Sequence, residues 1–231
     1  MTATAPRASR TRRALRVLSS VLIVAGTILL ADAGTTLLWQ EPVSAVYAHF
    51  QQGELGNQLV ELEQAPLAPA EKRALAKIPD PKRRLAFRAR SLERRLEPGD
   101  PMGRIVIPAI SVSDVFVQGT GSGDLRKGPG HYPATPLPGE HGTVAIAGHR
   151  TTYGAPFRNV DKLDPGDRIE LRMPYARFTY RVERTKIVPP TELSVTDRVD
   201  HDRLVLSACH PLYSAAQRII VFARLESSVP R

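Results

Sequence analysis

Residues 204–223 read LVLSACHPLYSAAQRIIVFA, and this stretch holds two short apolar runs on either side of a polar turn. The runs, 204–207 and 218–223, are rich in Leu, Ile and Val, and β-branched residues favour strands. Pro211 ends the first run, because proline cannot donate a hydrogen bond to a strand ladder. A connection of this length can return antiparallel, so the stretch predicts two neighbouring β-strands.

Similar short runs recur through the C-terminal half of the chain, separated by turns that contain Gly and Pro. They lie at 104–107, 115–117, 143–147, 168–172 and 178–182. Seven or eight short strands over roughly 125 residues, with no long helical period, are typical of a β-sandwich or a closed barrel. The sequence therefore predicts an all-β domain over 98–231, which begins at a PGDP turn.

The N-terminus has the composition of a membrane anchor. Residues 1–16 contain five Arg and no acid, and a largely apolar stretch follows over 17–39. A helix of that length can cross about 30 Å of hydrocarbon, and arginines before a span favour a cytoplasmic N-terminus. We therefore expect a basic cytoplasmic tail, one transmembrane helix with Trp39 and Tyr47 near the outer interface, and the remainder of the chain outside the cell.

A cleaved signal peptide is the alternative for the same segment. Residues 17–30 have the length of its hydrophobic region, and Ala31-Asp32-Ala33 matches its cleavage site. Both interpretations place the β domain outside the cytoplasm. Proteins there usually pair their cysteines or lack them, so the single cysteine of this chain is notable.

The charge of the chain is unevenly distributed. Of the formal net charge of +9, residues 1–16 carry +5 and residues 71–96 carry +7, which leaves −3 for the rest. Because the two most basic segments lie outside the β domain, the composition disfavours a nucleic-acid-binding function. Hydrophobic residues at 42% and charged residues at 24% are ordinary for a globular protein and exclude collagen-like and wholly disordered chains.

Residues 40–97 are predicted to form an extracytoplasmic helical segment and a basic linker. The pattern over 43–62 predicts one amphipathic helix, weakly interrupted by Gly53 and Gly56. We expect 71–96 to be a solvated linker with two short helices. The alternative for this basic stretch is attraction to anionic headgroups or wall polymers.

Cys209 follows the apolar run 204–207 and precedes His210-Pro211, so it lies at the end of a strand beside a loop. A free cysteine is most often a small buried hydrophobe. The alternative is a nucleophile that substrate can reach. A thiol has a pKa of about 8.5, and a neighbouring histidine or cation increases the reactive thiolate fraction.

His149 is the best candidate for that histidine. It ends the apolar run 143–147, and Gly148 before it leaves room for close approach. His210 is a weaker candidate, because adjacent side chains of an extended chain point in opposite directions. Three further histidines lie in polar turns and are expected to be solvated: His131, His141 and His201.

An acyl-transfer site also needs a group that faces the developing oxyanion. Arg218 opens the run 218–223, and a returning antiparallel strand would bring it beside the thiol. Most arginines in such a place are surface charges. A zinc site built from His149, Cys209 and His210 has no paired metal-ligand spacing to support it.

Two motifs in this order resemble the sortase family. The stretch TVAIAGHR (143–150), followed by YGAPF (153–157) and LDPGD (163–167), is similar to the histidine half of a sortase. The stretch LVLSACHP (204–211), followed by RIIVFA (218–223), is similar to its cysteine and arginine half. The N-terminal anchor and WQEP (39–42) resemble the class E sortases of actinobacteria.

The resemblance implies a cysteine transpeptidase on an eight-stranded closed β-barrel. Cys209 would attack the Thr–Gly carbonyl of a C-terminal LPXTG-like sorting signal, in which class E members favour Ala at the second position, and form a thioester. His149 would act as general acid and then as base, and Arg218 would hold the substrate carbonyl or oxyanion. The expected partners are secreted proteins that carry the signal, an amine of a peptidoglycan precursor, and the membrane.

One departure from the family pattern concerns the nucleophile. Sortases usually have Thr-Leu-x-Thr-Cys, whereas this chain has VLSAC at 205–209 and lacks both threonines. The replacement by Ala208 bears on rate or substrate preference. No cofactor is implied, and although some sortases use calcium, the sequence offers no acidic cluster to which calcium can be assigned.

Two other functions stay open at this point. A pilus-polymerising sortase often has an Asp-Pro-aromatic lid and a second C-terminal span, whereas here Asp80-Pro81 is followed by Lys82 and the sequence ends at Arg231 without such a span. A membrane-tethered barrel that binds the wall without catalysis is the second alternative.

Overall fold

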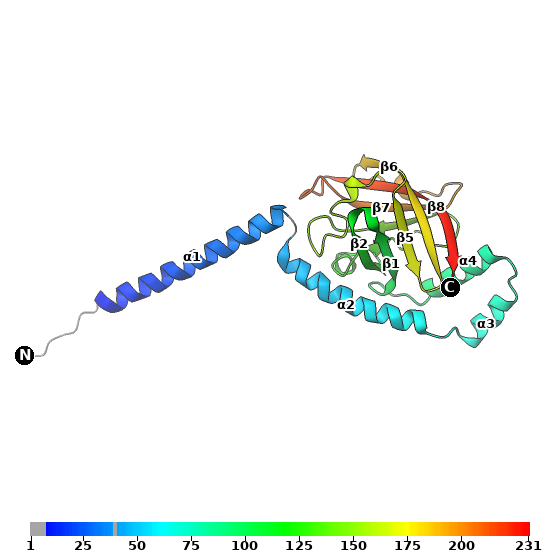
Figure 1. The fold of residues 1–231 in the computed structure, drawn as a ribbon, viewed down its shortest axis with the longest axis horizontal. Helices are drawn as coiled ribbons and strands as arrows, with labels where there is room; N and C mark the ends of the chain where they lie inside the picture. The colour runs from blue at the N-terminus through cyan, green and yellow to red at the C-terminus, as the bar shows by residue number, and fades with distance from the viewer. Residues whose placement is uncertain (1–7, 39–40) are drawn as a thin grey trace, which may run out of the picture. The chain divides into compact units, whose positions relative to one another are not determined.

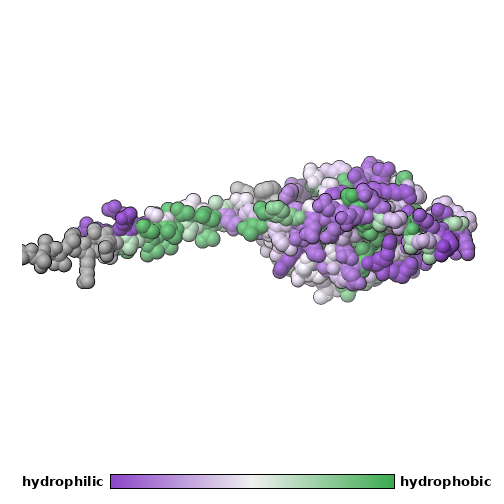
Figure 2. Space-filling view, turned by 90° about the horizontal axis from the view of Figure 1, so that it is seen from below, coloured by the Kyte–Doolittle hydropathy of each residue, from purple (hydrophilic) through white to green (hydrophobic). Residues whose placement is uncertain are grey.

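The computed structural model describes residues 8–38 and 41–231, which fall into two compact units divided at Pro42. The first unit contains helix α1 (Ala8–Leu38), of which Thr11–Thr35 is long and apolar enough to cross a membrane. The apolar side chains between Leu15 and Leu30 are exposed, as the green surface of Figure 2 shows. Thr27 and Thr35 each donate a hydroxyl hydrogen bond to a carbonyl of the same helix, four residues earlier. The predicted role of Trp39 lies outside the described residues.

The second unit is built on a closed eight-stranded barrel, which confirms the all-β prediction and excludes the sandwich (Figure 1). The strands, in the order in which they neighbour one another, are β1 (Pro101–Ile107), β2 (Val112–Gln118), β3 (Gly130–His131), β4 (Thr143–Ala147), β7 (Arg203–His210), β8 (Gln217–Pro230), β6 (Ala176–Val188) and β5 (Arg168–Met173). The short helices between them are η1 (Pro108–Ile110), α5 (Ser122–Leu125), η2 (Val160–Lys162) and η3 (Leu193–Thr196). Strand β3 has too few residues to show an alternating pattern, which is why the sequence did not reveal it.

Helix α2 (Pro42–Gln64) runs without a break through Gly53 and Gly56. This confirms the prediction of a single helix in this segment. Leu55 and Leu59 pack against Val115 and Val117 of β2. Gln52 completes the backbone hydrogen bonds of this strand, because its amide nitrogen donates to the Val115 carbonyl at 2.9 Å and its amide oxygen accepts from the Val115 N–H at 2.7 Å. A buried backbone group needs such a partner, so α2 is attached to the barrel wall by polar as well as apolar contacts.

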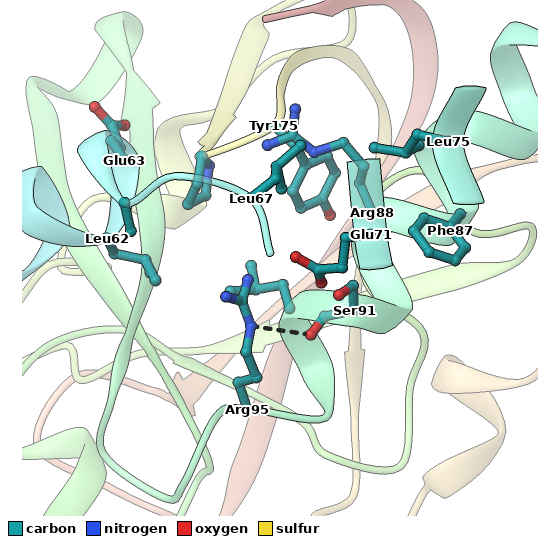
Figure 3. A pocket seen from close by; sticks show the side chains of 13 residues that line it. Leu62, Glu63, Leu67, Glu71, Leu75, Phe87, Arg88, Ser91, Arg95 and Tyr175 are labelled. Atoms are coloured by element: carbon teal, nitrogen blue, oxygen red, sulfur yellow. Dashed lines mark hydrogen bonds between the residues drawn. The ribbon is translucent and has the colours of Figure 1, made fainter. Parts of the chain in front are cut away.

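Helices α3 (Pro69–Ala76) and α4 (Pro81–Glu93) occupy the segment expected to be a solvated linker, and that expectation is wrong for the apolar face of α4. Leu85, Ala89 and Leu92 are buried and belong to the main core cluster of the barrel. Their spacing of four and three residues places them on one helix face. Figure 3 shows a small cavity here, lined by side chains of α2, α3, α4 and the β5–β6 turn.

The start of α4 includes the Asp80-Pro81 pair. Asp80 is the N-cap of the helix, and its carboxylate accepts from the Arg83 N–H at 2.7 Å. The helix lies beside residues 224–228, in the second half of β8. Arg218 is six residues earlier on that strand, which corresponds to about 20 Å at 3.3 Å per residue. The Asp-Pro pair is therefore remote from the end of the barrel that carries Cys209.

His131 was expected to be solvated, and that expectation is wrong. The imidazole is completely buried, with Nδ1 2.9 Å from Gln118 Oε1 and Nε2 3.1 Å from Thr135 Oγ1. Burial lowers the pKa of His131 from 6.5 to about 4. The side chain lies on β3, so a neutral histidine forms part of the folded barrel at ordinary pH.

We predict that this histidine makes the barrel less stable in mild acid. Between pH 6.5 and 4 the unfolded chain takes up a proton that the folded chain resists, so the free energy of unfolding falls by up to about 3 kcal/mol as the pH is lowered. Urea unfolding of residues 43–231 across this pH range measures the effect. His131→Gln should make the free energy of unfolding depend less on pH, whereas substitution of the exposed His141 by Gln should leave that dependence unchanged. An equal pH dependence in both variants would show that His131 is not its cause.

Candidate active site

The strand register brings Cys209, His149 and Arg218 to one end of the barrel. Strands β4 and β7 are parallel with Ala147 opposite Ser207, and the Gly148 N–H continues the ladder to the Ser207 carbonyl at 3.0 Å. Two residues further along, His149 therefore lies beside Cys209. On the other side of β7, Cys209 is directly opposite Arg218 of β8. Neighbouring strands are about 4.8 Å apart, so three residues distant in sequence come within side-chain reach.

Cys209 and Arg218 also share one face of the sheet. Alternate residues of β7 and β8, among them Leu206, Ala208 and Ile219, point into the main core. Cys209 and Arg218 alternate with these residues and therefore lie on the outer face. Cys209 is a partly exposed free cysteine. The interpretation of Cys209 as a fully buried hydrophobe is thus not supported, because the residue is partly exposed to solvent.

His149 is in an environment that favours its neutral form. Burial, and to a smaller extent the positive charge of Arg126, lower the pKa of His149 below its ordinary value. The ring of Tyr153 lies against it, with 5.3 Å between ring centroids. A neutral imidazole beside a thiol can accept the thiol proton, and the resulting imidazolium can donate that proton to a leaving amine.

Two close contacts fix the loop that carries His149. A side chain at Gly148 would place its Cβ 2.5 Å from the buried ring of Phe157, so only glycine fits this position. The Phe157 N–H donates to the His149 carbonyl at 2.9 Å. Gly148 therefore allows the backbone before His149 to approach the Phe157 ring closely.

Arg218 contacts its own loop in this structure. Its Nη1 donates to the carbonyls of Ala215 and Gln217, each at 3.0 Å. The side chain is half-buried at the start of β8. A guanidinium has five N–H donors, so bonds from one nitrogen to the loop do not exhaust its capacity to bind a carbonyl oxygen.

The comparisons with known proteins cover the part of the chain that carries this site. The model of the sortase domain matches residues 105–226. This chain belongs to the sortase family. Sortase D of Bacillus subtilis (strain 168) is 35% identical over 132 residues, which are 55% of this chain and 65% of that relative. The chain thus spans less than two thirds of the length of that curated relative.

Solved sortase structures share the fold. Sortase E from Streptomyces avermitilis is 34% identical with a TM-score of 0.54, and the match covers 58% of this chain and 93% of that one. Sortase E1 from Streptomyces coelicolor, solved with a tripeptide in the active site, is 28% identical with a TM-score of 0.56, and the match covers 59% of this chain and 94% of that one.

Arg150 is a residue of this sortase site that the sequence analysis did not single out. Its side chain is 2% exposed and forms an ion pair with Asp161 at 2.8 Å. It donates to the Arg158 carbonyl at 3.0 Å and to the Cys209 carbonyl at 3.4 Å. A buried charge needs partners of this kind. Arg150 therefore connects the loop after His149 to the strand end that carries Cys209. Its position next to His149 in the sequence was the feature that could have identified it.

The unusual Ala208 of this sortase lies on the core side of β7. It is buried among the main cluster, opposite Ile219 of β8. It therefore points away from the face that Cys209 occupies. Within residues 8–38 and 41–231, we find no group of three or more His, Cys, Asp or Glu side chains that could hold a metal ion.

Proposed function

We propose that this chain is a membrane-anchored cysteine transpeptidase that cleaves a C-terminal LPXTG-like sorting signal, with Pro or Ala at the second position, and joins the protein to an amine of a cell-wall precursor. The observation that carries the proposal is the strand register, which places Cys209 opposite Arg218 and puts His149 two residues beyond the Ala147–Ser207 pair, with Cys209 partly exposed. The family identity of residues 105–226 supports it.

The proposed reaction has two acyl-transfer steps. The Cys209 thiolate attacks the Thr–Gly carbonyl carbon, Arg218 donates to the oxygen that gains negative charge, and the protonated His149 gives its proton to the departing glycine amine. A thioester remains. The incoming amine then loses a proton to neutral His149 and attacks the thioester carbon, which forms a new amide and releases the thiolate.

Helix α1 supports a location at the membrane. Arginines precede its apolar part, so we propose a cytoplasmic N-terminus and an extracellular barrel. The anchor would keep the enzyme where secreted proteins and lipid-linked wall precursors meet. The place of Asp80 as the N-cap of α4 favours wall attachment over pilus polymerisation, because this Asp-Pro pair is remote from Cys209.

A cleavage assay with the full chain in detergent tests the function. Peptides with Leu-Pro-x-Thr-Gly and Leu-Ala-x-Thr-Gly should be cut between Thr and Gly, and added triglycine should convert the hydrolysis product into a ligated one. A peptide in which the Thr and Gly are exchanged serves as the control. Absence of cleavage in both signal peptides, with Cys209 reduced, would contradict the proposal and favour a non-catalytic wall-binding barrel.

The proposed roles of His149 and Arg218 predict large losses of turnover. His149→Ala and Arg218→Ala should each lower kcat/KM by roughly 10²-fold or more, as expected for the loss of general acid–base catalysis or of an oxyanion donor. Steady-state cleavage of the preferred peptide measures both. Arg224→Ala, on the same strand but exposed and paired with Glu183, is the matched control. A rate within twofold of wild type in either variant would remove the assigned role.

A further inference from the structure

The first turns of α2 lie against the loop that carries His149. We infer that Tyr153 is a positioning residue for the His149 imidazole, and that α2 holds Tyr153 in place. This makes a helix outside the matched sortase domain, residues 105–226, part of the catalytic apparatus. The inference rests on the proposed function, in which His149 handles the protons of both acyl-transfer steps.

Tyr153 supports the imidazole directly. The two rings are 5.3 Å apart between centroids and tilted by 41°. The Arg126 guanidinium lies 5.6 Å from the centroid of the Tyr153 ring. Aromatic contacts of this kind have preferred geometries, so Tyr153 restricts the orientations that the imidazole can adopt beside Cys209.

The backbone at Tyr153 is in a conformation that needs support. Tyr153, Gly154 and Ala155 have φ angles of 51°, 75° and 44°, so three consecutive residues lie in the left-handed region. Residues with a Cβ atom rarely adopt this region, and they remain there only where the surrounding structure holds them. Ordinary turn contacts contribute part of this support, since the Ala155 N–H donates to the Thr152 carbonyl at 2.9 Å.

Helix α2 provides further support from one face. Ser44 Oγ accepts a hydrogen bond from the Tyr153 N–H at 2.8 Å. The Tyr47 ring meets the Tyr153 ring edge-on, at 6.2 Å and 75°. A Cβ built on Gly154 would lie 3.3 Å from the Cβ of the buried Ala48. Positions 44, 47 and 48 have the i, i+3, i+4 spacing of one helix face, so the first turns of α2 present one face to this loop.

The same helix is attached firmly to the barrel further along. Gln52 bonds the backbone of β2, and Leu55 and Leu59 pack against its outward side chains. The helix can therefore act as a rigid support between the barrel wall and the loop. Small displacements of a catalytic group are costly, because the reaction depends on the aligned geometry of the reacting atoms.

The test compares aromatic-to-alanine variants of the full chain in detergent, with kcat and KM measured on the cleaved peptide. Tyr153→Ala should lower kcat roughly 10- to 100-fold with KM within about twofold of wild type. Tyr153→Phe keeps the ring and should restore most of the loss. Tyr47→Ala should lower kcat by a smaller factor. Phe50→Ala is its matched control, because Phe50 lies on the same helix, is 70% exposed and contacts the ring of His49.

A second measurement follows the imidazole without any turnover. The NMR signals of the His149 ring, assigned with His149→Gln, should shift in Tyr47→Ala and remain unchanged in Phe50→Ala. A kcat of Tyr153→Ala within twofold of wild type, or equal effects of Tyr47→Ala and Phe50→Ala on both kcat and the His149 signals, would overturn the inference. If the wild-type chain cleaves no sorting peptide, the proposed function fails, and the His149 signals still decide whether α2 positions the ring.

Discussion

Cys209→Ala should abolish cleavage of a sorting peptide, with turnover reduced by more than roughly 10⁴-fold, because no other group can form the thioester. The structure places this thiol on the outer face at the end of β7, partly exposed and opposite Arg218. The measurement is peptide cleavage followed by chromatography. Mass spectrometry of the wild-type chain, quenched during turnover, should find the acyl group on Cys209.

The appropriate control is Ala208→Thr, which restores the residue that sortases usually have before the cysteine. Because Ala208 faces the barrel core, this variant tests whether a hydroxyl is tolerated there, while the thiol itself is untouched. It should retain cleavage. Wild-type turnover in Cys209→Ala would show that the mechanism is wrong, whatever Ala208→Thr does.

Leu92→Ala should destabilise the barrel by about 2–5 kcal/mol, the usual cost of a large-to-small change in a packed core. Leu92 of α4 is 2% exposed and belongs to the main core cluster, although it precedes the first strand. Urea unfolding of residues 43–231, with the change in midpoint converted through a common m-value, measures the loss. The same reasoning predicts that a fragment beginning at residue 98 is markedly less stable than one beginning at residue 43.

Leu193→Ala provides the comparison for this prediction. Leu193 lies in η3 and is 75% exposed, so the same substitution should change the free energy of unfolding by less than about 0.5 kcal/mol. If Leu92→Ala were as mild as Leu193→Ala, α4 would not be part of the core, and the segment would be the solvated linker that its charge suggests.

The strands of the barrel were largely visible in the sequence, because their apolar and β-branched runs are local signals. Their lengths were not. Strand β8 continues from the predicted end at 223 to Pro230, since its second half pairs with β6 and not with a local partner. The burial of α4 was missed because its arginines dominate the composition, although Leu85, Ala89 and Leu92 already form a helical stripe.

In the candidate site, too, some features follow from the sequence and others do not. The chemical identities of Cys209, His149 and Arg218 and their places at the ends of apolar runs follow from the sequence. The roles of Arg150 and Tyr153 do not follow from the sequence, because each depends on contacts with residues on other elements. Arg150 donates to the Cys209 carbonyl of β7. Tyr153 contacts Ser44 and Tyr47 of α2. The burial of His131 on the short strand β3 belongs to this second group as well.

The amino-acid sequence alone therefore determined that the chain has an apolar N-terminal helix, an all-β domain, and a thiol, an imidazole and a guanidinium at three strand ends. Only the tertiary structure decided that the strand ends carrying these groups are neighbours. The parallel pairing of β4 with β7 joins residues about sixty positions apart, and such a register is set by closure of the barrel and packing of its core. Local propensity acts over a few residues and cannot specify it.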